Sequence, residues 1–307
     1  MKKDEILPVP ARMIACPPAR QIRSGGEGSG RQGGPGGSSK MDRLPIASGS
    51  FYPGNKEELV SVLKTHMDNS LEKRKVLGAI SPHAGYVYSG SVMGSVFSRI
   101  YVPDTVVILA PNHTGRGTPY SIWPEGCWRT PLGKTSTDEE LVNEILNSCE
   151  LIEKNEAAHT NEHSAEVILP FLQYNNPQVK IAVIVIRSGN FEELRMIGKS
   201  IGDVLKKIRP DALVVASSDM THYESQQSAD KKDKSAIAEI VALREEGLYR
   251  VVRKLDVSMC GVSPVISMLV CSKERAATKA ELIRYETSGE VTGDYDQVVG
   301  YAGVIVE

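Results

Sequence analysis

Short apolar runs alternate with longer amphipathic segments from about residue 43 to the C-terminus. The apolar runs have the length of buried strands, and the amphipathic segments repeat their apolar positions at helical spacing. Strands are predicted at 76–80, 105–110, 180–186, 211–216, 280–287 and 301–306. The first helix is predicted to begin at residues 54–58. Further helices are predicted at 90–101, 138–148, 162–174, 192–207, 229–244 and 265–271, and a shorter one after 229–244 ends near residue 255. This alternation predicts a single three-layer α/β domain at residues 42–307, with a mainly parallel or mixed central sheet.

Polar residues at the starts of these segments predict where several helices begin. Asn55 is the expected N-cap of the first helix, and Thr137 that of the helix at 138–148. Ser263 and Pro264 make a good cap and first-turn pair for the helix at 265–271. Residues 115–131 are rich in Gly, Pro and Trp, which predicts a long loop or a hairpin over the sheet.

The first 41 residues differ in composition from the rest of the chain. Residues 24–39 form a Gly/Ser-rich tract that cannot bury enough apolar surface to offset its ordering entropy. We therefore predict a disordered low-complexity leader at residues 1–41. Because Met41 would start the foldable part, one hypothesis is that residues 1–40 are an upstream extension of the reading frame.

The charge balance argues against nucleic acid as a partner. The whole chain carries a net charge of −2, but residues 1–40 hold seven Lys and Arg against three Asp and Glu. The remaining chain is therefore acidic, with a net charge of −6, whereas nucleic-acid binding depends on basic surfaces. No apolar run approaches the ~20 residues that span a bilayer, so no membrane partner is expected.

Cysteine usage gives an expectation about the compartment. The five cysteines form no CxxC pair and are odd in number, which gives little support to a disulfide framework or a zinc ribbon. With 41% hydrophobic and 24% charged residues, the composition is typical of a soluble globular protein. A reducing cytoplasm is therefore the expected location.

Three of the six histidines follow predicted strands within about six residues of the strand end. They are His83, His113 and His222. A lone histidine is more often a packed or surface residue, but three in equivalent positions form a pattern. Ligands bind at the carboxyl edge of the sheet in α/β folds, so we expect these imidazoles to line a site there. Two histidines with one anionic ligand describe ferrous sites that keep open positions for oxygen or substrate.

Cys260 is the candidate third ligand. It precedes Gly261 and a predicted helix, whose dipole would lower the thiol pKa and favour the thiolate. The alternative is a buried cysteine that acts as a small hydrophobe. Asp219 lies three residues before His222 and could orient that imidazole or raise its basicity. The alternative there is that Asp219 caps the turn after its strand.

A further acidic and histidine cluster comprises Glu162, His163 and Glu166 at the start of the predicted helix 162–174. The pattern favours a structural interpretation, in which the two carboxylates meet the positive end of the helix dipole.

Six motifs, taken in order, resemble those of the Memo family. They are Gly49-Ser50-Phe51-Tyr52-Pro53, Pro82-His83-Ala84-Gly85-Tyr86, Pro111-Asn112-His113, Glu162-His163-Ser164-x-Glu166 with Leu169-Pro170-Phe171, Ser217-Ser218-Asp219-x-x-His222, and Cys260-Gly261-x-x-Pro264. That family includes the B component of the AmmeMemoRadiSam system, and its fold is similar to that of class III extradiol ring-cleaving dioxygenases. The resemblance implies a metal-type pocket lined by His83, His113 and Cys260, with Asp219 and His222 beside it. Tyr86 and His163 match motif positions and are the expected substrate-binding residues.

The chain departs from the dioxygenases in its third ligand position, where they carry a carboxylate and this chain presents Cys260. A thiolate favours iron or copper in a redox role over ring cleavage. One hypothesis is therefore a non-haem iron-dependent oxidoreductase, in which Asp219 orients His222 as general base for a small organic substrate. The other is a non-catalytic binding module that holds a peptide or a radical-enzyme partner in the same pocket. The chain has no G-x-S-x-G elbow and no phosphate-binding G-x-x-x-x-G-K-[ST] loop.

Overall fold

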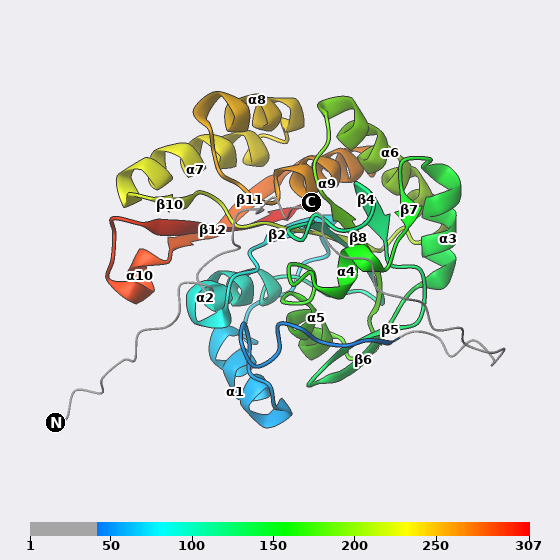
Figure 1. The fold of residues 1–307 in the computed structure, drawn as a ribbon, viewed down its shortest axis with the longest axis horizontal. Helices are drawn as coiled ribbons and strands as arrows, with labels where there is room; N and C mark the ends of the chain where they lie inside the picture. The colour runs from blue at the N-terminus through cyan, green and yellow to red at the C-terminus, as the bar shows by residue number, and fades with distance from the viewer. Residues whose placement is uncertain (1–41) are drawn as a thin grey trace, which may run out of the picture.

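Residues 42–307 are described by a computed structural model, in which a nine-stranded mixed sheet is covered by helices on both faces (Figure 1). The strand order is β10-β12-β2-β9-β3-β8-β4-β7, and β11 pairs with β12 outside this path. The leader predicted at residues 1–41 lies outside the described residues. Among the described helices, none has the length and apolar character needed to cross a membrane.

The centre of the sheet is parallel. It consists of β2 (Gly78–Ser81), β9 (Leu213–Ser217), β3 (Thr105–Pro111) and β8 (Lys180–Ile186). These strands are almost wholly buried, which explains why they appear in the sequence as unbroken apolar runs. Because they run in one direction, their carboxyl ends meet at a single edge of the sheet.

Antiparallel strands flank this centre and make the sheet mixed. On one side β12 (Val298–Val306) pairs with β2, with β11 (Ala280–Thr287) and with the short β10 (His222–Glu224). On the other side β4 (Tyr120–Ile122) pairs with β8, and β7 (Glu153–Lys154) follows.

The helices form two outer layers. Helices α1 (Lys56–His66), α2 (Tyr86–Phe97) and α5 (Leu169–Asn175) pack on one face. The other face is covered by α3 (Glu139–Ser148), α6 (Phe191–Ile208), α7 (Gln226–Val241) and α9 (Val262–Glu274), with α8 (Glu245–Leu255) against α7 and α9. Strand β3 shows how the layers arise, because Val107 and Leu109 join one core while Val106 and Ile108 join the other. The predicted three-layer α/β fold is confirmed.

The Gly/Pro/Trp-rich segment contributes a second, smaller sheet. Strands β5 (Cys127–Thr130) and β6 (Gly133–Ser136) form a hairpin, and β1 (Asp42–Arg43) pairs in parallel with β5. Two short helices, α4 (Ala157–Thr160) and α10 (Gly289–Thr292), complete the elements.

Several predicted helix starts differ from the structure; α2, for example, begins at Tyr86 and not at residue 90. Asp138, not Thr137, caps α3, because its side chain accepts the N–H of Leu141. The predicted helix 162–174 begins only at Leu169, since residues 162–168 form turns whose carboxylates bind other segments. Helix α9 begins at Val262 after an N-cap at Gly261 that has no side-chain hydrogen bond, so Ser263 lies within the first turn.

Candidate metal centre

The carboxyl ends of three neighbouring parallel strands bring the predicted residues together. His83 follows β2 by two residues, His113 follows β3 by two, and Asp219 follows β9 by two. Cys260 comes from the turn before α9. One candidate ligand atom from each of His83, His113 and Cys260 lies within 4.8 Å of the others. The strand-end pattern therefore does assemble one cluster, at the edge where α/β folds bind ligands.

His83 is fully buried and points its Nε2 atom into the cluster. That atom lies 3.5 Å from Cys260 Sγ and 3.9 Å from Asp219 Oδ2. On the opposite side of the ring, Nδ1 lies 2.6 Å from Ser217 Oγ. Burial, followed by the neighbouring His113, holds the pKa of His83 well below its ordinary value. The imidazole is therefore neutral, which is the form that binds a metal ion.

His113 is held in a similar way by a carboxylate. Its Nδ1 lies 2.9 Å from Glu162 Oε1, and its backbone N–H donates to Glu162 Oε2 at 2.5 Å. The other ring nitrogen, Nε2, is buried and has no hydrogen-bond partner among the described residues. A buried polar atom without a partner needs an explanation, and a bound cation would provide one.

Cys260 lies against the loop that carries Asp219. Its Sγ atom accepts the backbone N–H of Asp219 at 3.3 Å. Burial, and after it the Asp219 carboxylate, raises the pKa of this thiol well above its ordinary value. The expected lowering by the helix dipole is therefore wrong for the metal-free protein, because burial and a neighbouring carboxylate outweigh the field of the helix end. A cation in the cluster would be the group that favours the thiolate.

Asp219 and His222 complete the cluster on the side of Cys260. Asp219 is fully buried, and its Oδ1 accepts the backbone N–H of His83 at 2.9 Å, so the carboxylate reaches the β2 loop instead of capping its own turn. Its Oδ2 and both ring nitrogens of His222 are buried without a hydrogen-bond partner in the described chain. Candidate ligand atoms of Asp219, His222 and Cys260 also lie within 4.8 Å of one another.

The two expected substrate-binding residues occupy different places. His163 stacks on His113, with ring centroids 5.1 Å apart, and burial lowers its pKa to about 3. Tyr86 packs in the core, and its hydroxyl donates to the carbonyl of Val167 at 2.8 Å. The structure therefore places His163 at the cluster, while the hydroxyl of Tyr86 forms a hydrogen bond with the backbone of the 162–168 segment.

Glu162 and Glu166 were interpreted from the sequence as partners of a helix dipole, and the structure corrects this. Both are fully buried and both precede α5. Glu162 binds His113, whereas Glu166 accepts the guanidinium of Arg43 at 2.6 Å and the hydroxyl of Tyr52 at 2.7 Å. Sequence reasoning missed their roles because their partners are distant in the chain.

Asp233 anchors the segment between Asp219 and His222. This fully buried residue of α7 accepts the N–H and the hydroxyl of Thr221, at 3.0 and 2.6 Å, and the hydroxyl of Tyr285 at 2.8 Å. No cation pairs with it among the described residues. Burial raises its pKa from 3.8 to about 6, and the nearby Asp230 adds to this effect.

We expect this titration to appear in the pH dependence of stability. The folded protein binds the proton of Asp233 more tightly than the unfolded chain, so its contribution is lost as pH rises from about 4 to about 6. Relative to Asp233→Asn, the free energy of unfolding of the wild type should fall by up to about 3 kcal/mol across that interval. Urea unfolding at a series of pH values measures this difference. A difference that stays constant with pH would contradict the prediction.

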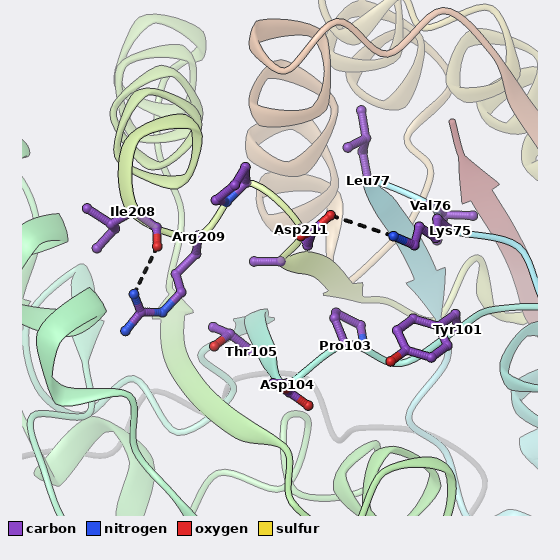
Figure 2. Close-up of a pocket in the computed structure, with 12 residues that line it drawn as sticks. Lys75, Val76, Leu77, Tyr101, Pro103, Asp104, Thr105, Ile208, Arg209 and Asp211 are labelled. Carbon is purple, nitrogen blue, oxygen red and sulfur yellow. Dashed lines mark hydrogen bonds and ion pairs between the residues drawn. The ribbon is translucent and has the colours of Figure 1, made fainter.

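A cavity of about 480 Å³ lies at the edge of the sheet opposite to the histidine cluster (Figure 2). It is bordered by the residues before β2 and β9, by Thr105 at the start of β3, and by Arg209 after α6. Its charged rim includes Lys75 and Asp211, which are 4.0 Å apart and largely exposed. These are the amino ends of the strands whose carboxyl ends carry the histidines, so the cavity is separate from the histidine cluster.

The sequence matches the family described as Memo-like protein over residues 43–305. A MEMO1 family protein of Methanocaldococcus jannaschii is 41% identical over 284 residues, covering 86% of this chain and 99% of its own. One from Aquifex aeolicus is 42% identical over 265 residues, covering 86% and 98%. Among solved structures, the uncharacterized protein JW3007 from Escherichia coli K12 aligns with a TM-score of 0.48 and 10% identity, over 75% of this chain and 99% of that chain. The matches to the archaeal and bacterial relatives extend over nearly the whole described chain.

Proposed function

The chain belongs to the Memo family, and we propose that it is a metal-binding, redox-associated protein whose centre is formed by His83, His113 and Cys260. One observation supports this most directly. Each imidazole has its Nδ1 beside a protein oxygen. Nε2 of His83 faces Cys260, and Nε2 of His113 is buried without a hydrogen-bond partner among residues 42–307. Two imidazoles and a thiol are a donor set that fits a transition metal.

Iron(II) is the metal we propose first, with copper as the other candidate. Imidazole suits both metals, and a thiolate suits copper(I) and iron in redox roles. When bound, the metal would supply electron transfer to or from a small organic molecule or oxygen in a dioxygenase-like pocket. The activity we propose is that of a non-haem oxidoreductase in the cytoplasm.

Asp219 and His222 are the residues we propose for proton handling. His222 is in reach of a ligand in the cluster through two ring nitrogens that have no other hydrogen-bond partner in the described chain. It can take or return a proton there, with the carboxyl group of Asp219 beside it to orient the ring. His163 would contact the organic ligand from the opposite side, next to Phe51, whose ring centroid lies 4.6 Å away.

The first test is metal content after anaerobic purification. Wild type should hold near-stoichiometric iron or copper, and His83→Ala, His113→Ala and Cys260→Ala should each lose it. Cys149→Ala and His66→Ala, which change a buried cysteine and a histidine outside the cluster, should keep it. Elemental analysis gives the stoichiometry, and oxygen consumption with catechols then tests turnover.

The opposite results are equally informative. A wild type that stays metal-free even after loading with ferrous or cuprous ions would overturn the metal centre. Bound metal without turnover of any substrate would favour the alternative, a binding module for a peptide or for a radical-enzyme partner.

A further inference from the structure

The two histidines proposed as ligands, His83 and His113, are both held by one short segment, Glu162–Ser164, which contributes none of the three proposed ligands. Glu162 binds His113 directly. Ser164 reaches His83 through the hydroxyl of Ser217. A hydrogen bond within the segment holds the Glu162 side chain, because the N–H of Ser164 donates to Glu162 Oε1 at 3.0 Å.

The contacts of Glu162 determine which nitrogen of His113 carries the proton. A carboxylate only accepts hydrogen bonds, so the ring nitrogen 2.9 Å from Oε1 must be an N–H. The second oxygen accepts the backbone N–H of the same histidine, which fixes the direction of the carboxylate. In the neutral ring, Nε2 is then left with its lone pair.

The contacts of Ser217 give the same answer for His83. Its hydroxyl has one proton, and that proton is donated to the carbonyl of Ser164 at 2.8 Å. The oxygen of Ser217 can therefore only accept from Nδ1 of His83, at 2.6 Å. The proton is again on Nδ1, and the lone pair of Nε2 faces Cys260.

We propose that Glu162 and Ser217 are positioning residues that fix His113 and His83 in the Nδ1–H tautomer, so that both Nε2 lone pairs are presented to the same point before any ion arrives. The effect on metal binding rests on the proposed function, but the tautomers do not. They can be measured in the metal-free protein, so failure of this proposal is distinguishable from failure of the metal centre.

The experiment is long-range ¹H–¹⁵N NMR of the metal-free protein labelled at histidine. In wild type, His83 and His113 should each show a protonated Nδ1 and an unprotonated Nε2. The two donors of His113 bind different oxygens of Glu162, and in Glu162→Gln one of these oxygens is replaced by an NH2 group, which donates and cannot accept. The Nε2–H tautomer of His113 should then appear, while His83 stays unchanged.

The control is Glu166→Gln, which removes an equally buried carboxylate four residues away that binds Arg43, Tyr52 and the backbone N–H of Ala47. It should leave both tautomers as in wild type. If it shifts His113 as much as Glu162→Gln does, or if wild-type His113 carries its proton on Nε2, the proposal is overturned.

Ser217→Ala tests the assignment of the His83 tautomer. Because it removes only one hydroxyl, it also keeps the proposal testable if Glu162→Gln does not fold. It should release His83 from the Nδ1–H form without changing His113. The matched control is Ser267→Ala, another fully buried serine, whose hydroxyl donates to the carbonyl of Leu194 at 3.1 Å. An unchanged His83 in Ser217→Ala would contradict the assignment.

Metal titration adds the functional consequence. Outer partners of metal ligands typically contribute about 10–100-fold to metal affinity, and we expect losses in that range for Glu162→Gln and Ser217→Ala. Glu166→Gln and Ser267→Ala should bind as wild type does. Changed tautomers with unchanged affinity would show that these residues orient the rings but do not affect metal binding, which would overturn that part of the proposal.

Discussion

Replacing Arg43 with alanine is expected to lower the free energy of unfolding by about 3–5 kcal/mol. Arg43 is 3% exposed, and its guanidinium binds Glu166 at 2.6 Å and the carbonyls of His159 and Glu162 at 3.0 and 2.6 Å. It also lies 4.1 Å from the ring centroid of Trp128. Its removal leaves the Glu166 carboxylate buried without a counter-charge, and it leaves two buried carbonyls without this donor. Urea denaturation of both proteins measures the difference.

The cause can be separated from simple loss of volume. Glu166→Gln on the Arg43→Ala background removes the uncompensated charge, so the double variant should be more stable than the sum of the two single effects predicts. Arg74→Ala is the surface control, because its ion pair with Glu281 is partly exposed and should contribute only about 0–1 kcal/mol. An Arg43→Ala effect no larger than that of Arg74→Ala would contradict the prediction.

Arg43 also connects the N-terminal strand to the site. Arg43 is in β1, and Glu166 follows the segment that holds His113. Glu166 in addition accepts the backbone N–H groups of Ile46 and Ala47. The first described residues are thereby fixed to the 162–168 segment. Because Arg43 also donates to the carbonyl of Glu162, we infer that its loss would loosen the carboxylate that orients a proposed metal ligand, as well as destabilise the fold.

The strand-end histidines could be predicted from the sequence because two local facts determine their position. Each follows an unbroken apolar run, and parallel buried strands place their carboxyl ends at one edge. This reasoning brought His83, His113 and His222 to the same region. The helix start after Cys260 made it the candidate third ligand and the family resemblance implied the same residue, but nothing local relates the turn before α9 to β2 or β3.

The supporting contacts could not be predicted, because they join residues that are far apart in sequence. Arg43 and Glu166 are separated by 123 positions, and His83 and Ser217 by 134. Local sequence patterns predicted the wrong contacts where a side chain binds a residue that is distant in the sequence. Glu162 and Glu166 lie in a helix-like pattern but bind His113 and Arg43, and the thiol of Cys260 responds to burial more than to the helix end.

Gly261→Ala is expected to displace Cys260 and to weaken metal binding by at least the ~10–100-fold that outer-shell changes cause. A Cβ atom at residue 261 would lie 2.2 Å from the carbonyl oxygen of Ser217 and 2.4 Å from the Cβ of Ser218. Both atoms belong to backbone or to a short side chain, so the turn before α9 must move away from β9. Overpacking of this kind also costs about 1–3 kcal/mol of stability.

The matched control is Gly54→Ala, at an exposed glycine where the nearest atom to a new Cβ would be 3.4 Å away. It should keep wild-type metal content and stability. Titration of both variants with ferrous and cuprous ions, together with urea unfolding, gives the two quantities separately. Wild-type affinity in Gly261→Ala would show that Cys260 tolerates displacement from Asp219 and His83, and its assignment as the third ligand would then have to be abandoned.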